Sequence, residues 1–488
     1  MSTRHDPLAA FTRYPDWLAA GMDGDRVAES LQPRLHRLGV GDATLVACHP
    51  ERLRAKQDQW VARYRLRLRR PGDPAEEELV LVGRLWAPHQ WHDGNGAGWS
   101  VSLPDLRLTL RPQPHDVDLP ALPALTDPAR MAGLLQRVVA ERYPGAVVRS
   151  CVPHVVRYKP GSRCTLVVDV TYASPPSGHP GSPARPAPSP VVVKTHQGDK
   201  GAVAWQAMTA LWERADRWHG AVRLAEPLAY LPAQRVLVQG PIPEEQTLKL
   251  LAARAFGAVT RDGAAHYGTA HNGAAHDGAG PVAQLRSALR RTAHALAVLH
   301  DTGAVYTRAW TLEQELAEVG EVVDRLALTV PALAGGAAPL RESLAGRASA
   351  YPPDPHVPAH HDFRPAQVLL HGDELGFIDF DGAAMAEPAL DLGRFRAKLR
   401  DTAVWAHLNA GGTLDGAGFA RHLALVDELC EELVEAYRER AAVSRQRVRL
   451  WETCDLLTTM LHAWTKVRLA RLEPRLAILR HATGGHRS

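Results

Sequence analysis

The feature that most constrains the fold is a change in hydrophobic pattern along the chain. Residues 55–86 hold two runs of alternating apolar and polar residues around a Pro-Gly-Asp-Pro sequence, which predicts a β-hairpin. From residue 282 onward, apolar residues such as Leu285, Leu289 and Leu296 recur at helical spacing. A β-rich first half followed by an α-rich second half predicts an α+β chain with two lobes and a ligand cleft between them.

The middle of the chain has a well-defined order of elements. Residues 152–159 and 164–172 predict two strands joined by a tight Pro-Gly turn, and 190–196 predict a third strand. A helix is expected over 201–214. Another is expected over 127–142, with Asp127 as its N-cap and proline at its first helical position. The order is therefore helix, strand, turn, strand, long loop, strand and helix.

Two low-complexity segments interrupt this order. Proline density over 174–190 blocks helix and central strand, so we expect an exposed loop there. The second segment, 257–281, is rich in glycine and carries His266, His271 and His276. Their spacing of five does not place them on one helical face, so we interpret the segment as an insertion rather than a metal carrier.

Composition excludes several classes of protein. The net charge of +4 over 488 residues is too small to indicate a nucleic-acid partner, and no apolar run is long enough to cross a bilayer. The first residues lack the basic-then-apolar pattern of a signal peptide. Five scattered cysteines without a C-x-x-C pair indicate reduced thiols. We therefore expect a cytoplasmic protein without membrane or nucleic-acid partners.

The residues that carry chemistry lie in two short segments, 360–370 and 377–382. Asp362 precedes the first strand of a predicted hairpin and Asp379 ends the second, so strand pairing should bring both carboxylates to the same end. Gln367 adds an amide oxygen. Oxygen ligands of this kind suit Mg²⁺, usually together with substrate phosphates. One aspartate can then orient a hydroxyl while the other holds metal, as phosphoryl transfer requires.

At these positions the sequence resembles the aminoglycoside phosphotransferase-like family of small-molecule kinases. The family signature is H-G-D-x-x-x-x-N, then I-D-[FW]-[DE], then D-L. Asp362 matches the catalytic aspartate, residues 378–381 match the metal-binding strand, and residues 391–392 match the D-L pair. Two positions depart from the pattern: His361 replaces the glycine and Gln367 replaces the asparagine.

The resemblance implies roles for individual residues. Asp362 would be catalytic, and Gln367 and Asp379 would bind Mg²⁺. Lys194, at the end of a β-branched run, would contact the nucleotide phosphates. The helix glutamate that usually pairs with such a lysine is not obvious, since Gln206 and Glu213 are both weak matches.

Other nucleotide contacts are implied by position alone. Ser162 and Arg163 lie in the turn that would cover the phosphates, where a single glycine replaces a glycine-rich motif. Gln239 lies in the strand and hinge that would meet the adenine ring. The implied cofactors are ATP and Mg²⁺.

The resemblance also implies a bilobal protein-kinase-like fold with an extra N-terminal α/β cap region. We expect residues 1–145 to form a cap or degenerate N-lobe, 146–240 the N-lobe, and 241–488 a helical C-lobe with the catalytic loop. The expected function is ATP-dependent transfer of a phosphoryl group to a small-molecule hydroxyl. The alternative is a pseudokinase-like scaffold that binds nucleotide without phosphotransfer.

The acceptor is not identified by the sequence. An acidic stripe between Asp427 and Glu435 could receive a cationic acceptor, although a solvated helix face is the simpler interpretation. Trp405, Trp451 and Trp464 could stack on a sugar, with core packing as the default. Aminoglycoside, sugar and choline-like acceptors stay open.

Overall fold

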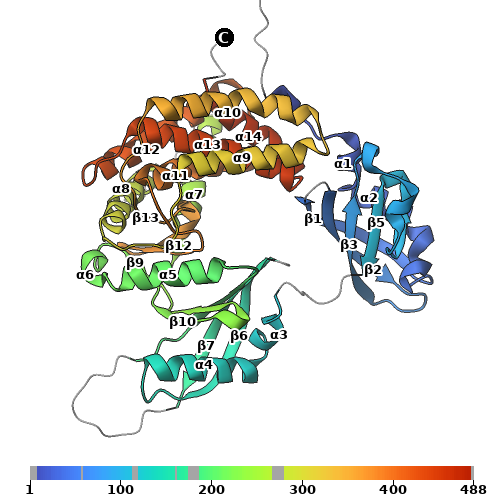
Figure 1. Cartoon of the computed structure of the whole chain (residues 1–488), viewed down its shortest axis with the longest axis horizontal. Coiled ribbons are helices and arrows are strands. Elements are labelled where there is room, and N and C mark those ends of the chain that lie inside the picture. Colours follow the sequence, from blue (N-terminus) through green and yellow to red (C-terminus); the bar gives the residue numbers. More distant parts are fainter. Residues whose placement is uncertain are drawn as a thin grey trace, which may run out of the picture. The chain divides into compact units, whose positions relative to one another are not determined.

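The structure is a computed structural model that describes residues 8–56, 59–112, 119–159, 162–173, 186–265 and 280–484 (Figure 1). The chain divides into two compact units that alternate along the sequence. The first comprises Met1–His115, Leu312–Pro352 and Thr453–Ser488, and the second comprises Asp116–Thr311 and Pro353–Glu452.

The first unit combines helices with a five-stranded antiparallel sheet in the order β1-β2-β3-β5-β4. The strands are β1 (Thr44–Lys56), β2 (Gln59–Arg69), β3 (Glu76–Leu85), β4 (Val101–Leu103) and β5 (Leu108–Pro112). The helices are α1 (Asp16–Ala20), α2 (Gly24–Leu31), α9 (Leu312–Ala327), α10 (Ala332–Ala350), α14 (Leu469–Ala482) and the 3₁₀ turns η1 (Ala9–Phe11), η2 (Gln32–Leu38), η3 (Pro88–Gln90), η4 (Asp93–Gly96) and η5 (Pro104–Leu106). The predicted hairpin is confirmed, because β2 and β3 pair with Arg69 opposite Glu76.

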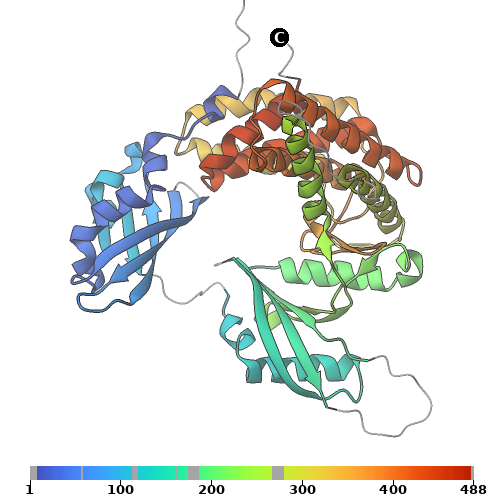
Figure 2. The same cartoon turned by 180° about the vertical axis from the view of Figure 1, so that it is seen from behind.

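The second unit begins with a lobe built on the antiparallel sheet β10-β11-β8-β7-β6. Its strands are β6 (Val148–Lys159), β7 (Arg163–Tyr172), β8 (Val191–His196), β10 (Pro227–Leu231) and β11 (Val236–Gln239). Its helices are α3 (Leu122–Leu125), α4 (Pro128–Arg142), α5 (Lys200–Trp212), α6 (Ala215–Trp218) and the turn η6 (Pro232–Gln234). Figures 1 and 2 both show α5 between this sheet and the strands of the following lobe.

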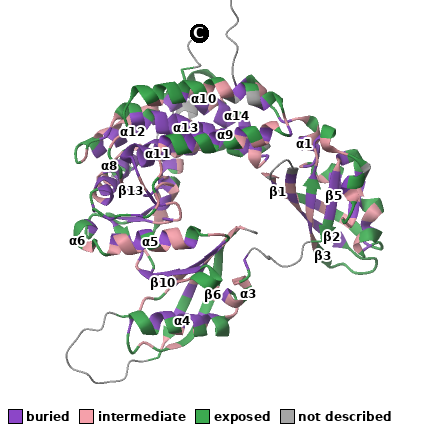
Figure 3. Ribbon diagram, in the orientation of Figure 1, coloured by how far each residue is buried: buried purple, intermediate pink, exposed green. Residues whose placement is uncertain are grey.

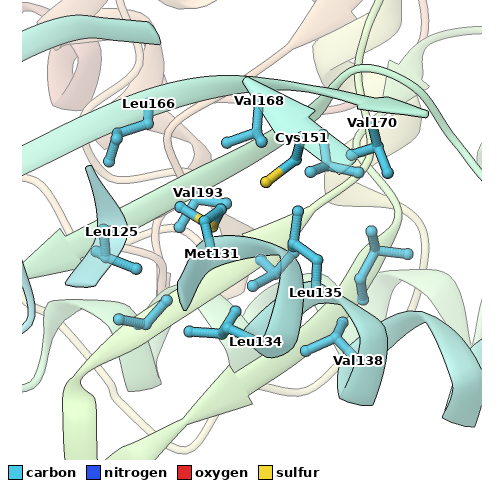
Figure 4. Packing of buried hydrophobic residues seen from close by; sticks show 14 of the residues in the cluster. Leu125, Met131, Leu134, Leu135, Val138, Cys151, Leu166, Val168, Val170 and Val193 are labelled. Carbon is cyan, nitrogen blue, oxygen red and sulfur yellow. The ribbon is translucent and has the colours of Figure 1, made fainter. Parts of the chain in front are cut away.

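Helix α4 belongs to this sheet rather than to the first unit. The Asp127 carboxylate accepts a hydrogen bond from the Arg130 N–H at 2.8 Å, which confirms the predicted N-cap. Figure 4 shows Met131, Leu135 and other apolar side chains of α4 packed against the inner face of the strands. The boundary expected at residue 145 therefore does not coincide with the boundary between the units, which follows His115. The reason is that the apolar stripe of α4 is buried only against this sheet.

The rest of the second unit is mainly helical. Its helices are α7 (Leu248–Ala265), α8 (Pro281–His300), α11 (Pro388–Asn409), α12 (Gly416–Arg438), the turn η7 (Pro365–Gln367) and α13 (Arg445–Thr465), which contributes residues to both units. Its strands are β9 (Arg223–Leu224), β12 (Gln246–Thr247), β13 (Val357–Ala359), β14 (Val368–His371), β15 (Glu374–Phe377) and β16 (Ala384–Ala386). Figure 3 shows α11 as largely buried, in keeping with its central place among α7 and α12.

The expected α+β class, with a β-rich lobe followed by an α-rich lobe, is confirmed. All five cysteines are free and buried, as predicted for core thiols. No helix among the described residues is both long and apolar enough to span a membrane. Most of the proline-rich segment and the three histidines of the glycine-rich segment lie outside the described residues.

Candidate functional site

Three side chains singled out from the sequence meet at one carboxylate. Lys194 Nζ lies 3.2 Å from Asp379 Oδ1, and Gln367 Nε2 donates to Asp379 Oδ2 at 3.0 Å. Lys194 ends a β-run in the first lobe, while Gln367 and Asp379 flank the β14–β15 hairpin in the second. Val368 pairs with Phe377 in that hairpin, which holds residues 367 and 379 side by side. All three side chains are largely buried.

Arg163 joins the same cluster and brings a second carboxylate with it. Its Nη1 atom lies 3.2 Å from Asp379 Oδ1 and 2.9 Å from Asp381 Oδ2. His196 Nε2 lies 3.0 Å from the same Asp381 oxygen. The sequence reasoning placed Arg163 in the turn but did not foresee contact with either aspartate, and it missed His196. The signal was available, because His196 follows Lys194 by two and so lies on the same face of β8.

The electrostatic balance of the cluster keeps Asp379 ionised. Burial by itself would raise the pKa of the Asp379 carboxyl. The charges of Lys194 and Arg163 outweigh that cost and hold its pKa well below the ordinary value. Asp379 also has a φ of +77°, in the left-handed region that side chains rarely adopt. A strained, ionised and buried carboxylate of this kind is typical of functional sites.

The loop that carries Asp362 is fixed from behind by one buried carboxylate. Asp391, in the first turn of α11, accepts the backbone N–H groups of His360 and His361, each at 2.7 Å. His300 Nε2 lies 3.1 Å from the same carboxylate. His360 in turn reaches the Ile378 carbonyl through Nε2 at 2.9 Å. Through these bonds Asp391 and His360 support the loop.

Asp391→Asn is expected to destabilise the protein by about 2–3 kcal/mol. The carboxamide keeps one acceptor oxygen but turns an N–H₂ group toward a buried N–H donor, which loses hydrogen bonds at a completely buried position. Urea unfolding at pH 7 measures the change. Asp324→Asn, at an exposed position of α9, is the control and should leave stability within about 0.5 kcal/mol of wild type. An Asp391→Asn protein as stable as the control would contradict this role.

His361 departs from the family pattern in a way that the backbone explains. Its φ is +71°, a conformation that glycine adopts without strain. Arg394 compensates by contacting His361 Nδ1 at 2.9 Å and also its carbonyl oxygen, and the Trp310 ring lies edge-on at 5.4 Å. Burial and the Arg394 charge lower the pKa of His361, so its ring stays neutral. The contacts with Arg394 and Trp310 thus allow a histidine at a position where the backbone favours glycine.

Asp362 itself faces the open side of the loop. Its side chain is 43% exposed, and a carboxylate oxygen lies 3.0 Å from Arg364 Nη2. The backbone N–H of Asp362 donates to the His360 carbonyl at 3.0 Å. The carboxylate is therefore held at the surface of the site with one cation beside it.

The two remaining nucleotide-contact candidates have different settings. Gln239 is buried at the end of β11, opposite Val192, and lines a small cavity together with Ile378 and Asp379. The Ser162 N–H donates to the Lys159 carbonyl at 3.0 Å, and the Ser162 carbonyl accepts from Gln197 at 2.8 Å. The backbone N–H of Ser162 is thus used within the turn, which differs from the expected orientation toward phosphate.

Residues 213–451 match the model of the phosphotransferase enzyme family, APH. Over these residues the chain is similar to that family. The match includes Asp362, Gln367 and Asp379 but not Lys194, and it confirms the resemblance seen in the sequence.

Several solved structures are similar to the chain at 15–17% identity. A choline/ethanolamine kinase family protein from Mesorhizobium loti is 16% identical, with 72% of this chain and 94% of that chain covered and a TM-score of 0.42. The GDP and kanamycin complex of APH(2")-IIIa is 15% identical, with 72% and 99% covered and a TM-score of 0.41. A glucosamine kinase in complex with glucosamine, ADP and inorganic phosphate is 17% identical, with 92% and 98% covered and a TM-score of 0.45. No curated protein sequence matches the chain significantly.

The phosphotransferase site is chemically suited to a metal that arrives with its substrate. Among the described residues, no cluster of three or more histidine, cysteine, aspartate or glutamate side chains is placed to hold a metal. Mg²⁺ needs no such cluster, since it is usually held by one or two carboxylates and by substrate phosphates. Asp379, Asp381 and the Gln367 amide supply oxygen atoms of that kind.

Among the described residues, no carboxylate of α5 is paired with Lys194. Gln206 of α5 accepts a hydrogen bond from Thr307 at 2.9 Å, and Glu213 follows the end of α5. Lys194 contacts Asp379 directly instead. The Lys194 ammonium group therefore has a carboxylate beside the β14–β15 hairpin as its partner.

The acidic stripe on α12 of the phosphotransferase is used for packing. Its carboxylates pair with arginines of neighbouring segments, in the pairs Asp427–Arg400, Glu428–Arg286, Glu431–Arg396, Glu432–Arg286 and Glu435–Arg445. Trp451 and Trp464 are completely buried, and Trp405 is partly buried. The stripe and two of the three tryptophans thus have structural partners, which favours the packing interpretation over an acceptor site.

Proposed function

We propose that the chain is an ATP-dependent phosphotransferase that transfers the terminal phosphoryl group of ATP to a hydroxyl of a small molecule. The family match supports phosphotransferase activity on small molecules in general. The observation that carries the finer proposal is the meeting of Lys194, Gln367 and Asp379 at distances of 3.0–3.2 Å, next to the loop that presents Asp362. Phosphoryl transfer is mostly positioning and charge neutralisation, and this cluster offers both.

The roles follow from the position and charge of each group. Lys194 and Arg163 would exchange their contacts with Asp379 for contacts with nucleotide phosphates, as cations of this kind favour phosphate oxygens. Asp379 and the Gln367 amide would hold Mg²⁺, which neutralises phosphate charge. Gln239 would lie beside the adenine end of the cleft.

Asp362 would orient the acceptor hydroxyl and receive its proton. The acceptor oxygen forms a bond to the terminal phosphorus while the bond from phosphorus to the bridging oxygen breaks, leaving ADP. Exposure of the Asp362 carboxylate allows an acceptor to reach it, and the bonds from Asp391 keep its loop from shifting. A fixed base within reach of the hydroxyl is what general-base catalysis needs.

The proposal is tested by a screen of hydroxyl compounds for acceptor-stimulated release of ADP. Amino sugars, neutral sugars, aminoglycosides and choline-like alcohols should be present, because the described residues do not distinguish among them. At least one compound is expected to raise ADP release well above the rate without acceptor. An inactive screen together with the absence of Mg–nucleotide binding would contradict the proposal.

A nucleotide-binding scaffold without phosphotransfer is the second candidate. It is favoured by the direct Lys194–Asp379 contact and by the lack of a helix carboxylate bonded to Lys194 among the described residues. The two candidates differ in turnover, not in binding. A thermal shift with Mg–ATP but no ADP release with any acceptor would favour the scaffold, since a ligand that binds only the folded state raises the apparent stability.

A further inference from the structure

Two rows of polar side chains cross the sheet of the first lobe of the second unit. In one row Arg157 of β6 lies opposite Thr165 of β7, which lies opposite Lys194 of β8. In the next row Lys159 lies opposite Arg163, which lies opposite His196. Directly opposite residues, and residues two apart along a strand, share one face of a sheet. All six side chains therefore lie on the face that meets Asp379 and Asp381.

The cations on this face fall into two groups. Lys194 and Arg163 lie within 3.2 Å of Asp379, and Arg163 also pairs with Asp381. Neither Arg157 nor Lys159 has a hydrogen-bond or ion-pair partner among the side chains that the structure describes. The outer pair is thus uncompensated, while the inner pair is neutralised by two aspartates.

Arg364 brings a third uncompensated donor from the other lobe. Its guanidinium pairs with Asp362, but its Nε–H is buried without an acceptor among the described residues. Arg364 is close enough to Arg157 and Lys159 to act on their ionisation. A buried donor without a partner costs free energy, so a ligand that supplied an acceptor here would stabilise this side chain.

The outer cations repel one another in the absence of an anion. Burial and the charges of Arg163, Arg157 and Arg364 lower the pKa of Lys159 to about 8. Arg157 is largely exposed, but partial desolvation and the charge of Arg163 still lower its pKa. Asp379 attracts both Arg157 and Lys159 but is already paired with Lys194 and Arg163. The three outer cations Arg157, Lys159 and Arg364 are then left with one further carboxylate, Asp362. The excess of two positive charges matches the roughly two negative charges of a terminal phosphate group near neutral pH.

We propose that Arg157, Lys159 and Arg364 form a terminal-phosphate clamp, a cation group that binds the phosphoryl group being transferred. This inference rests on the proposed function. Lys194 and Arg163 would then serve the inner phosphates, next to Asp379. Arg364 would leave Asp362 for the terminal phosphate when nucleotide binds, which frees the Asp362 carboxylate to accept the hydroxyl proton.

If the clamp exists, substitutions in it should lower the affinity for ATP more than the affinity for ADP, which can be measured without turnover. Calorimetric titration with Mg–ATP and with Mg–ADP measures both affinities for wild type and for Arg157→Gln, Lys159→Gln and Arg364→Gln. Each substitution should lower the affinity for Mg–ATP about tenfold or more, because charge-assisted bonds to phosphate are lost. The affinity for Mg–ADP should change less than about twofold. Arg149→Gln, an exposed arginine of the same strand, is the matched control and should change neither.

Arg364→Gln has a second effect, because it leaves the Asp362 charge facing the phosphate. The double variant Asp362→Asn/Arg364→Gln separates the two effects. If Arg364 contacts the phosphate, the double variant still binds ATP about tenfold more weakly than Asp362→Asn alone. If Arg364 only neutralises Asp362, the double variant and Asp362→Asn bind ATP equally, which overturns its place in the clamp.

The outcomes distinguish this inference from the proposed function. Equal loss of ATP and ADP affinity in the three variants would show that these cations hold the inner phosphates, and would overturn the clamp. Unchanged affinities for both nucleotides would overturn it as well, with the proposed function intact. Failure of wild type to bind either Mg–nucleotide would overturn the proposed function itself.

Discussion

Asp362→Asn is expected to reduce acceptor-dependent ADP release by about a thousandfold, since a positioned general base contributes roughly 10²–10⁴ in rate. The carboxamide cannot take the hydroxyl proton but has nearly the same shape. The Asp362 side chain is 43% exposed, and among the described residues its ion-pair partner is Arg364, so the fold should be unaffected. Steady-state kinetics with the acceptor found by screening measures the loss.

Nucleotide binding provides the check on this variant. Its Mg–ADP affinity should stay within about twofold of wild type, because the inner phosphates lie near Lys194 and Asp379 rather than Asp362. Asp415→Asn is the control, as an exposed aspartate without a side-chain cap bond at the start of α12. Full turnover in Asp362→Asn would remove Asp362 from the mechanism.

Asp379→Asn is expected to lower both Mg–nucleotide binding and stability. Removing the charge leaves Lys194 and Arg163, both largely buried, with Asp381 as their remaining carboxylate partner among the described residues. Breaking a buried ion pair from one side costs about 3–5 kcal/mol. We therefore expect a loss of about 3 kcal/mol in the free energy of unfolding at pH 7, measured with urea, and no thermal shift with Mg–ATP.

The difference in the free energy of unfolding between wild type and Asp379→Asn should depend on pH in a defined direction. The pKa of Asp379 is held well below its unfolded value by Lys194 and Arg163, despite burial. A depressed carboxyl pKa adds stability above the unfolded pKa of about 3.9, and that stability is lost as the pH falls toward the folded pKa. The stability gap between wild type and Asp379→Asn should therefore be constant from pH 8 to 5 and shrink below about pH 4.

A matched substitution shows whether the effect comes from losing an aspartate charge in general or from losing one that is buried. Asp373→Asn changes an aspartate at the exposed turn of the β14–β15 hairpin, where the side chain is fully exposed. Surface pairs of this kind contribute little, so its stability should differ from wild type by less than about 0.5 kcal/mol at every pH. Equal stability of Asp379→Asn and Asp373→Asn at pH 7 would contradict the account of the buried cluster.

Predictions from the sequence were reliable where the pattern within a single helix or hairpin was sufficient to define it. The Asp127 N-cap, the 55–86 hairpin and the paired strands β14 and β15 all follow from turn chemistry and alternation, which act within a few residues. The order of Asp362, Gln367 and Asp379 around one hairpin was predictable for the same reason. The left-handed backbone at His361 was not predicted, although glycine at this position of the family pattern was an available signal.

The division of the chain was not predictable in this way. Helix α4 is amphipathic, and its sequence does not say which sheet its apolar stripe will cover. The structure buries it on the sheet of β6 to β11, so the unit begins near residue 116 and not at 146. Likewise, the sequence left open whether the acidic residues of α12 form a solvated face or an acceptor surface, and the structure pairs Glu431 with Arg396 and Asp427 with Arg400.

The amino-acid sequence alone determined the family, the α+β class and the identity of the carboxylate and amide around the β14–β15 hairpin, because these depend on residues close together in the chain. Only the tertiary structure decided that Arg163 pairs with Asp379 and Asp381, that His196 contacts Asp381, and that Arg157 and Lys159 lie on the same face of the sheet as Lys194. Contacts of this kind depend on strand register and on how the two lobes of the second unit pack. Both are determined by many residues at once, so a short stretch of sequence does not predict them.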